Sequence, residues 1–312
     1  MASISTKIGR FSLENPVILA SGILDETSGS ILRSLKSGAG AAVTKSIGTE
    51  ERKGYQTPVI SEIGTGLLNA VGLSNPGIDN FVEEYRNFPE KKRTIVSIFG
   101  GKVEEFVSLA RKVEGIGFDK VELNLSCPHV KGVGSEVGQD LGMVEEIISE
   151  ISGKTNLQIW AKLTPNVTDL ISLAKASEKA DAYVLINTLR ATGVEIYSRK
   201  FVLSNTVGGY SGPGVKPVAL RAVYDVYKET GKDIIGVGGI TTWQDAIEFF
   251  LLGAKAIQVG TAILYEDYPI FNKINSGIRD YLDKEGFARL DDLVGVMLSD
   301  ATFKSHRIDQ SE

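Results

Sequence analysis

The chain has 312 residues, of which 42% are hydrophobic and 23% charged, and its formal net charge at pH 7 is -5. These values exclude a disordered chain, and the net acidity argues against a nucleic-acid binder, which needs a concentrated Lys/Arg face. The single cysteine excludes an intrachain disulfide, and it excludes an iron–sulfur cluster held by this chain alone, because such a cluster needs about four thiolates. The 34 glycines, about 11% against an average near 7%, indicate tight turns or close approaches of backbone to ligand.

The sequence shows no targeting or membrane segment. Residues 1–16 lack the apolar stretch of a secretory signal, and no segment approaches the roughly 20 apolar residues that span a bilayer. We therefore expect a cytoplasmic protein that does not associate with a membrane. Because no repeat, low-complexity tract or change in composition marks a boundary, we expect one domain over residues 1–312.

Eight short apolar segments predict strands that are buried on both faces of a parallel sheet, because most are near-continuous apolar runs rather than alternating ones. They are residues 16–21, 41–47, 94–100, 120–126, 158–164, 182–188, 233–240 and 256–262. Between them, apolar residues at helical spacing predict helices over residues 103–117, 142–153, 167–180 and 241–254. The last of these opens with a cap of the Thr-x-x-Gln type.

Eight strands that alternate with helices over about 250 residues are typical of a (β/α)8 TIM barrel, an α/β fold. A doubly wound open sheet is the alternative, and it fits the number of units less well. Two connections, residues 48–93 and 190–216, are too long for plain loops, follow strand ends and are rich in Gly, Asn, Ser and Pro. We therefore expect inserted loops or short strands on the C-terminal face, where barrel enzymes build their active sites.

Polar groups end nearly every predicted strand, although strand stability does not require them. They are Ser21, Lys45–Ser46, Asn124–Ser126, Lys162, Asn187–Thr188, Gly238–Gly239 and Gly260–Thr261. Lys45 and Lys162 are the most informative, because a buried ammonium is costly unless it meets an anion. That anion is either a bound ligand or a carboxylate in a structural ion pair. With asparagines at neighbouring strand ends, the sequence favours the ligand.

The glycines that end the last two predicted strands indicate a phosphate site. In barrels, the loops after strands seven and eight commonly bind phosphate, since glycine lets backbone N–H groups approach it and a following helix N-terminus adds its dipole. Thr241 and Thr242 open such a helix. The alternative explanation for the glycines is tight packing of helix against strand.

Cys127, the lone cysteine, lies between Ser126 and Pro128 just beyond the fourth predicted strand. A buried cysteine is often an inert small hydrophobe, but a thiol held by a stiff turn near a cation can ionise and take a proton. Its position favours the catalytic interpretation. We expect no metal site, because the only histidines, His129 and His306, lack metal-ligand spacing with another His or Cys.

Over roughly residues 8–281, these motifs resemble the class 1 dihydroorotate dehydrogenases. The blocks that carry the resemblance are NPVILASG at 15–22, TKS at 44–46, LLNAVGLSNPG at 67–77, NLSCP at 124–128, AKLTPNVTD at 161–169, INT at 186–188, GGYSGPGVKPVALR at 208–221, GVGGI at 236–240 and VGTA at 259–262. The cysteine in NLSCP is similar to the class 1 base, because the membrane-bound class 2 enzymes use serine. KLTPNVTD and SGPGVKPVALR resemble class 1B catalytic subunits.

The resemblance implies an FMN barrel that oxidises (S)-dihydroorotate to orotate in de novo pyrimidine (UMP) biosynthesis. Cys127 would remove the C5 proton while the C6 hydride passes to flavin N5, and Lys162 beside the N1–O2 edge would favour the reduced flavin anion. The implied cofactor residues are Ala20, Ser21, Gly22, Lys45, Ser46, Asn124, Lys162 and Ile186, with Gly212, Gly238, Gly239, Gly260 and Thr261 around the phosphate. The implied substrate residues are Lys45, Asn69, Val71, Gly72, Leu73, Asn124, Asn187 and Thr188, with residues 71–73 using their backbone N–H groups on the carboxylate.

The class 1B resemblance also implies partners. It implies a homodimer and a separate subunit with FAD and an iron–sulfur cluster that passes electrons to NAD, whereas class 1A would imply fumarate as the acceptor. With one cysteine, this chain can reduce its flavin but cannot pass electrons onward through iron–sulfur centres of its own.

One departure from the family pattern leaves an alternative open. The common class 1 pattern has asparagine after Cys-Pro, and this sequence has His129. Cys-Pro-His followed by GQD, here at 138–140, also appears in dihydropyrimidine dehydrogenase-like proteins, whose substrates lack a carboxylate. NAVGLSNPG at 69–77 keeps the carboxylate loop, which favours dihydroorotate. A third hypothesis is a non-catalytic barrel that binds a phosphorylated ligand or a partner protein.

Overall fold

The computed structural model describes residues 1–125 and 137–298, and within them eight parallel strands close into a barrel. The strands are β3 (Val17–Leu19), β4 (Ala41–Val43), β7 (Thr94–Ile98), β8 (Lys120–Asn124), β9 (Gln158–Lys162), β10 (Ala182–Leu185), β15 (Ile234–Val237) and β16 (Ala254–Val259). All eight predicted strands are confirmed. The open-sheet alternative is wrong, because β16 pairs in parallel with β3 and leaves no edge.

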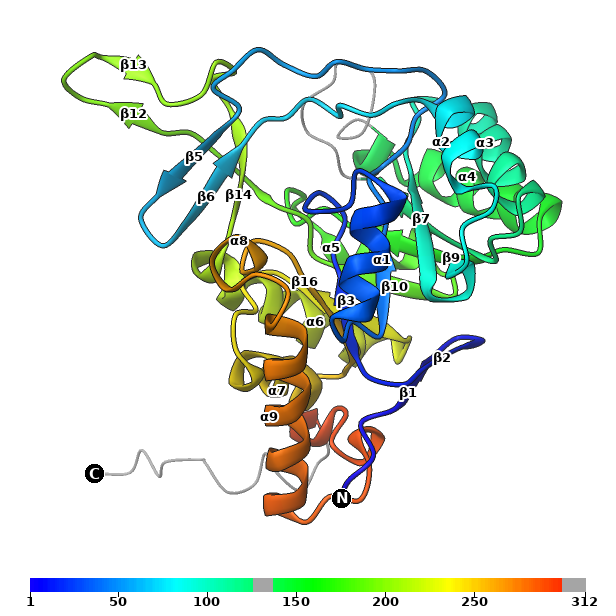
Figure 1. Ribbon diagram of the computed structural model, residues 1–312, viewed down its shortest axis with the longest axis vertical. Helices are drawn as coiled ribbons and strands as arrows, with labels where there is room; N and C mark the ends of the chain where they lie inside the picture. The colour runs from blue at the N-terminus through cyan, green and yellow to red at the C-terminus, as the bar shows by residue number, and fades with distance from the viewer. Residues whose placement is uncertain (126–136, 299–312) are drawn as a thin grey trace.

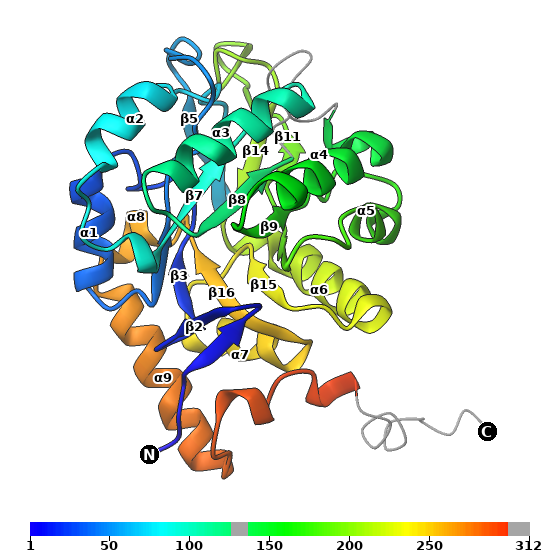
Figure 2. The same cartoon turned by 90° about the vertical axis from the view of Figure 1, so that its right-hand side faces the viewer.

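Helices surround the barrel (Figure 2). They are α1 (Ser28–Lys36), α2 (Ile78–Tyr85), α3 (Val103–Gly115), α4 (Leu141–Lys154), α5 (Leu170–Ala176), α6 (Lys216–Thr230), α7 (Trp243–Leu251), α8 (Ile263–Glu266) and α9 (Ile270–Glu285). Short 3-10 turns lie at Lys91–Arg93, Val137–Gln139, Pro213–Val215, Leu290–Asp292 and Val296–Leu298. None of the described helices is both long and apolar enough to cross a membrane.

Two predicted helices differ from the observed ones at their ends. The helix predicted over 167–180 is shorter, because Asp169 caps α5 by accepting the Ser172 N–H at 3.0 Å and the last turn closes at Ser177. The cap of α7 is Thr242 with Asp245, one residue later than expected. The side chain of Asp245 is shorter than that of Gln244, and it reaches the cap backbone directly.

An N-terminal hairpin covers the N-terminal end of the barrel (Figure 2). Its strands are β1 (Thr6–Ile8) and β2 (Phe11–Leu13). Gln158, at the start of β9, donates from Nε2 to the Ile8 carbonyl at 2.7 Å. The barrel interior above the hairpin is apolar, and its buried side chains include Ile18, Val43, Ile95, Trp160, Val184 and Ile235. The C-terminal end is therefore the end that is open to ligands.

The two long connections build a second, antiparallel sheet beyond the C-terminal ends of the barrel strands (Figure 1). The first contributes β5 (Ile60–Ile63) and β6 (Gly66–Asn69), and the second contributes β11 (Leu189–Ala191) and β14 (Gly208–Ser211), in the order β11-β14-β6-β5. A two-stranded hairpin, β12 (Val194–Glu195) and β13 (Lys200–Phe201), projects from it (Figure 1). The expectation of short strands inserted on this face is confirmed.

Candidate active site

A pocket lies between the open end of the barrel and the inserted sheet, and it brings together every described residue that the family resemblance implies for cofactor or substrate. Its walls include Ala20, Ser21, Gly22, Lys45, Ser46, Asn69, Val71, Gly72, Leu73, Asn124, Lys162, Ile186, Asn187, Thr188, Gly212, Gly238, Gly239, Gly260 and Thr261. The proposed base Cys127 and the departure at His129 lie outside the described residues.

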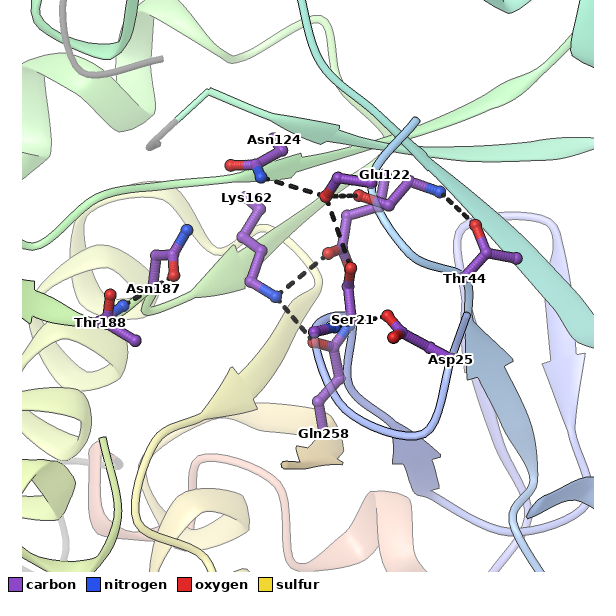
Figure 3. A network of polar contacts seen from close by, with 12 residues as sticks. Ser21, Asp25, Thr44, Glu122, Asn124, Lys162, Asn187, Thr188 and Gln258 are labelled. Carbon is purple, nitrogen blue, oxygen red and sulfur yellow. Dashed lines mark hydrogen bonds and ion pairs between the residues drawn. The ribbon is translucent and has the colours of Figure 1, made fainter. Parts of the chain in front are cut away.

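Lys162 stands at the floor of this pocket on a polar layer that crosses the barrel (Figure 3). Its Nζ lies 3.2 Å from Oε1 of Glu122 and 3.4 Å from Oε1 of Gln258. Gln258 in turn donates from Nε2 to Oε2 of Glu122 at 2.6 Å. The two interpretations of Lys162 therefore both apply, since the lysine has a structural ion pair and also lines the ligand pocket.

Lys45 has a much weaker counter-ion. The nearest carboxylate oxygen among the described residues belongs to Glu26, at 4.0 Å, and that side chain is 76% exposed, which screens its charge. Asp25 lies buried next to it, and burial raises the pKa of the Asp25 carboxyl, against the opposing pull of the Lys45 charge. No carboxylate oxygen among the described residues lies closer than 4.0 Å to Lys45 Nζ, so the lysine remains available to an anionic ligand.

Asp25 also ties together the two loops that carry pocket residues. Its Oδ2 accepts the N–H of Gly22 at 2.5 Å, and its backbone carbonyl accepts the N–H of Lys45 at 3.1 Å. Figure 3 shows the carboxyl inside the curve of the loop that follows β3. Neither contact is visible in the sequence, where Asp25 stands in an unremarkable loop.

Hydroxyl groups fill the space between the ends of β3, β4 and β7 (Figure 3). Ser46 Oγ lies 2.8 Å from Ser97 Oγ and 3.5 Å from Ser21 Oγ. Asn124 donates from Nδ2 to Ser46 Oγ at 3.1 Å. This network fixes the orientation of the Asn124 amide at the pocket wall, because the amide nitrogen already has an acceptor.

The loop over residues 71–73 lines the pocket. Gly72 and Leu73 both have left-handed backbone conformations, with φ of 79° and 56°, which only glycine adopts without strain. Asn75 is buried and holds the loop, donating to the Leu73 carbonyl at 2.9 Å and accepting the N–H of Gly77 at 2.9 Å. The N–H groups of residues 71–73 donate to no acceptor within the described part of the chain.

Three more polar side chains line the pocket, Asn69 from the inserted sheet and Asn187 and Thr188 from the segment between β10 and β11. Asn69, on β6, donates to the carbonyl of Gly209 on β14 at 3.1 Å. A Cβ at Gly209 would lie 2.2 Å from Thr188 Oγ1, so glycine is required there for Thr188 to reach the pocket. Asn187 accepts the Thr188 N–H at 2.8 Å.

Glycine is required for different structural reasons after β15 and after β16. Gly239 has φ of 77°, and a Cβ there would lie 2.7 Å from Cβ of Lys216, so the packing explanation applies to it. Gly260 has no such constraint, because its Cβ would meet only Cβ of Ala20, at an ordinary 3.6 Å. The space that a side chain at position 260 would fill belongs to the pocket, which is what close approach of a ligand requires.

Two N–H groups just before the first turn of α7 are already hydrogen-bonded within the chain. Thr241 and Thr242 donate their backbone N–H groups to Oδ2 of Asp245 at 2.9 and 2.8 Å, and Lys216 Nζ lies 2.7 Å from Oδ1. Although burial opposes it, these hydrogen bonds, with Lys216 the strongest, lower the pKa of Asp245 to about 2. The N–H groups of Trp243 and Gln244, the first two residues of α7, have no acceptor among the described residues and, with the glycine turns, would be the donors of a phosphate site here.

Sequence reasoning missed four side chains of this site: Asp25, Ser97, Glu122 and Gln258. Glu122 and Gln258 line the pocket, and Asp25 and Ser97 support residues that do. Each is a polar residue in or beside an apolar run, which was the available signal. Among the described residues, no group of three or more His, Cys, Asp or Glu side chains is arranged to hold a metal ion.

A closed parallel barrel with lysines, asparagines and glycine turns at its C-terminal end defines a barrel enzyme that binds anionic ligands. In comparisons with known proteins, the family model described as dihydroorotate dehydrogenase matches residues 3–282, and the chain belongs to this flavin-dependent family. The resemblance found in the motifs is confirmed.

Three similar proteins are each named as the catalytic subunit of dihydroorotate dehydrogenase B (NAD(+)). The protein of Thermoplasma acidophilum is 54% identical, over 96% of this chain and 100% of its own length. That of Pyrococcus furiosus is 50% identical, over 94% of this chain and 98% of its own. That of Methanothermobacter thermautotrophicus is 43% identical, over 94% and 98%.

Proposed function

We propose that this chain oxidises (S)-dihydroorotate to orotate in de novo pyrimidine biosynthesis, as the catalytic subunit of a dihydroorotate dehydrogenase. The observation that carries the proposal is that the pocket is lined by Lys45, which has only a weak counter-ion, and by residues 71–73, whose N–H groups have no acceptor among the described residues. Together these groups would bind a carboxylate. Dihydroorotate has a carboxylate, whereas dihydrouracil and dihydrothymine have none. The site and the names of the relatives both disfavour the dihydropyrimidine alternative.

FMN is the flavin that we propose for the other part of the pocket. The space beside Gly260, which a Cβ would fill, and the N–H groups of the glycine turns suit a phosphate. The residues that would hold it are Gly212, Gly238, Gly239, Gly260 and Thr261. Ala20, Ser21 and Gly22 would line the ring, and Ser46 and Ile186 would complete its walls. Lys162 would lie by its N1–O2 edge. When bound, the flavin supplies the hydride acceptor.

The remaining side chains would orient the substrate and move its proton. Lys45 and residues 71–73 would bind the carboxylate, while Asn69, Asn124, Asn187 and Thr188 would offer amides and a hydroxyl to a ring of alternating donors and acceptors. Cys127 would take the C5 proton, with the substrate fixed by these contacts. The proposed base follows β8 by three residues, close in sequence to Asn124 at the pocket wall.

We further propose an electron-transfer partner. The relatives are named catalytic subunits of NAD(+)-dependent enzymes, and a chain with one cysteine cannot hold an iron–sulfur cluster alone. A separate subunit with FAD and an iron–sulfur cluster, bound to a homodimer of this chain, would carry electrons to NAD. Fumarate reduction by the isolated chain would instead indicate the class 1A acceptor.

The test is an anaerobic titration of the purified, FMN-loaded protein. Dihydroorotate should bleach the flavin absorbance and dihydrouracil should not. Lys45→Met should keep FMN but require about tenfold or more dihydroorotate for half-reduction, because a charged hydrogen bond of about 1.5–3 kcal/mol is lost. Bleaching by dihydrouracil alone would establish the dihydropyrimidine alternative. A protein that takes up no FMN would support the non-catalytic barrel.

A further inference from the structure

Glu122 is a carboxylate in the barrel interior, with 0% of its surface exposed, and the function described so far assigns it no role. It lies on β8, two residues before Asn124, so both side chains point into the barrel. Gln258 lies on β16, four strands away around the barrel, and its Nε2 reaches Oε2 of Glu122 at 2.6 Å. The hydrogen bond therefore spans the barrel directly under the pocket (Figure 3).

Stability does not account for charge at this level of the barrel. The layer beneath it is filled by apolar side chains such as Ile18, Val43 and Val184. A buried ion pair contributes little net stability, and well-packed apolar residues of similar volume commonly replace such pairs without loss. Glu122, Lys162 and Gln258 all line the pocket, so the polar layer faces the ligand and not only the core.

The contacts of Lys162 show what this layer does to the lysine. An ammonium has three N–H donors. Nζ donates one of them to Oε1 of Gln258 at 3.4 Å, and it forms an ion pair with Oε1 of Glu122 at 3.2 Å. The lysine keeps donors for the pocket, and Glu122 places one negative charge against its positive charge.

We propose that Glu122 and Gln258 are positioning residues that aim the Lys162 ammonium at the flavin and limit the positive charge it presents there. Lys162 can act in this way only if the proposed FMN site is correct. Paired with Glu122, the lysine stabilises the negative charge of the reduced ring less than a lone ammonium would. The reduction potential of the flavin is thereby held below the value that Lys162 alone would give.

Glu122→Gln tests this, because it removes the charge and keeps the size and an acceptor for Gln258. The variant should retain FMN and show a higher flavin midpoint potential, by about 30 mV or more, the two-electron equivalent of a tenfold change. Sulfite, which adds to flavin N5 and leaves negative charge on the ring, should bind about tenfold or more tightly. Glu145→Gln, the same change on the exposed surface of α4, is the matched control and should shift neither value.

A second pair of variants covers the case in which Glu122→Gln leaves Lys162 so poorly paired that the protein does not fold. Lys162→Gln and the double variant Lys162→Gln/Glu122→Gln differ only in the carboxylate, and the double variant holds no buried charge from this pair. The double variant should bind sulfite more tightly than Lys162→Gln does. A merely structural role would weaken flavin binding without moving the potential in this direction.

The outcomes separate this inference from the proposed function. Suppose that dihydroorotate bleaches the wild-type protein, but removal of the Glu122 charge changes the sulfite affinity less than twofold, and the flavin potential by less than the equivalent amount, with Lys162 present and with Gln in its place. The role of Glu122 is then refuted and the proposed function stands. If the wild-type protein takes up no flavin, both fail together.

Discussion

Asp245→Asn is expected to destabilise the protein in a way that depends on pH. Asp245 accepts the backbone N–H and the hydroxyl of both Thr241 and Thr242, at 2.8 to 3.0 Å, and its other oxygen lies 2.7 Å from Lys216 Nζ. Asparagine keeps the size and one acceptor oxygen, but it loses the charge and turns an amide N–H₂ toward the ammonium. The substitution therefore isolates the electrostatic part of this cap.

The magnitude follows from the pKa of Asp245, which falls from 3.8 to about 2 in the folded chain. At 1.36 kcal/mol per unit, this difference corresponds to about 2 kcal/mol of stability at pH 7. The side chain is only 12% exposed, so solvent screens little of it. Because the folded pKa is depressed, the contribution is present above pH 3.8 and is lost as the pH falls toward 2, with about half remaining at pH 3.

The assay is urea unfolding of wild type and variant at pH 7, 5, 4 and 3. The difference in unfolding free energy should be about 2 kcal/mol at pH 7 and should shrink toward pH 3. Asp140→Asn is the matched control, because Asp140 caps α4 with no ammonium partner among residues 1–125 and 137–298 and asparagine caps equally well; it should change stability by less than about 0.5 kcal/mol. A difference for Asp245→Asn that is constant over this pH range would refute the reasoning.

Substitutions at four further positions test other parts of the site. Gly260→Ala should leave the unfolding temperature of the apoprotein unchanged or slightly raised, but it should weaken FMN binding by about tenfold or more in a fluorescence titration. Gly239→Ala should instead destabilise the apoprotein, because residue 239 has a positive φ and its Cβ would lie 2.7 Å from Cβ of Lys216. Unchanged FMN affinity in Gly260→Ala would remove that residue from the cofactor site. Cys127→Ala should retain FMN and slow its reduction by dihydroorotate about 10²- to 10⁴-fold in stopped-flow absorbance, while Cys127→Ser should keep partial activity at high pH; an unchanged rate for alanine would exclude Cys127 as the base. Asp25→Asn should be more stable than wild type at pH 8, and the gain should vanish on acidification, because burial raises the pKa of Asp25 and the folded state loses stability as that carboxyl ionises. A gain that persists at pH 4 would contradict this.

The barrel could be predicted because its signals are local. Each buried strand is a short apolar run, and parallel strands that alternate with helices close in chain order. The pocket could be predicted for the same reason, since every strand end is brought to one face of the barrel. Residues as distant in sequence as Ser21 and Thr261 thus meet in one pocket by topology alone.

The details that could not be predicted depend on distances across the fold. The contact between Glu122 and Gln258 joins positions 136 residues apart, on strands at opposite sides of the barrel. Nothing in either local sequence specifies that partner. The prediction of the α7 cap was wrong by one residue for a related reason. Thr241 and Thr242 are both acceptable N-caps, and the side chain of Asp245, which Lys216 of α6 supports, decides between them.

The partners of Glu122 and Asp245 come from distant parts of the chain, and the same is true of the partners of Lys45 and Lys162. A charged residue in an apolar run indicates that a partner exists, because an unpaired buried charge is too costly, but it does not say whether the partner is protein or ligand. The structure separates the two lysines by distance: Lys162 has a carboxylate at 3.2 Å, and Lys45 has none closer than 4.0 Å among the described residues. Lys45 is thus the lysine with the weaker counter-ion within the described part of the chain. Lys162 has a charge already balanced within the chain, which suits a group that tunes a cofactor rather than one that captures a substrate.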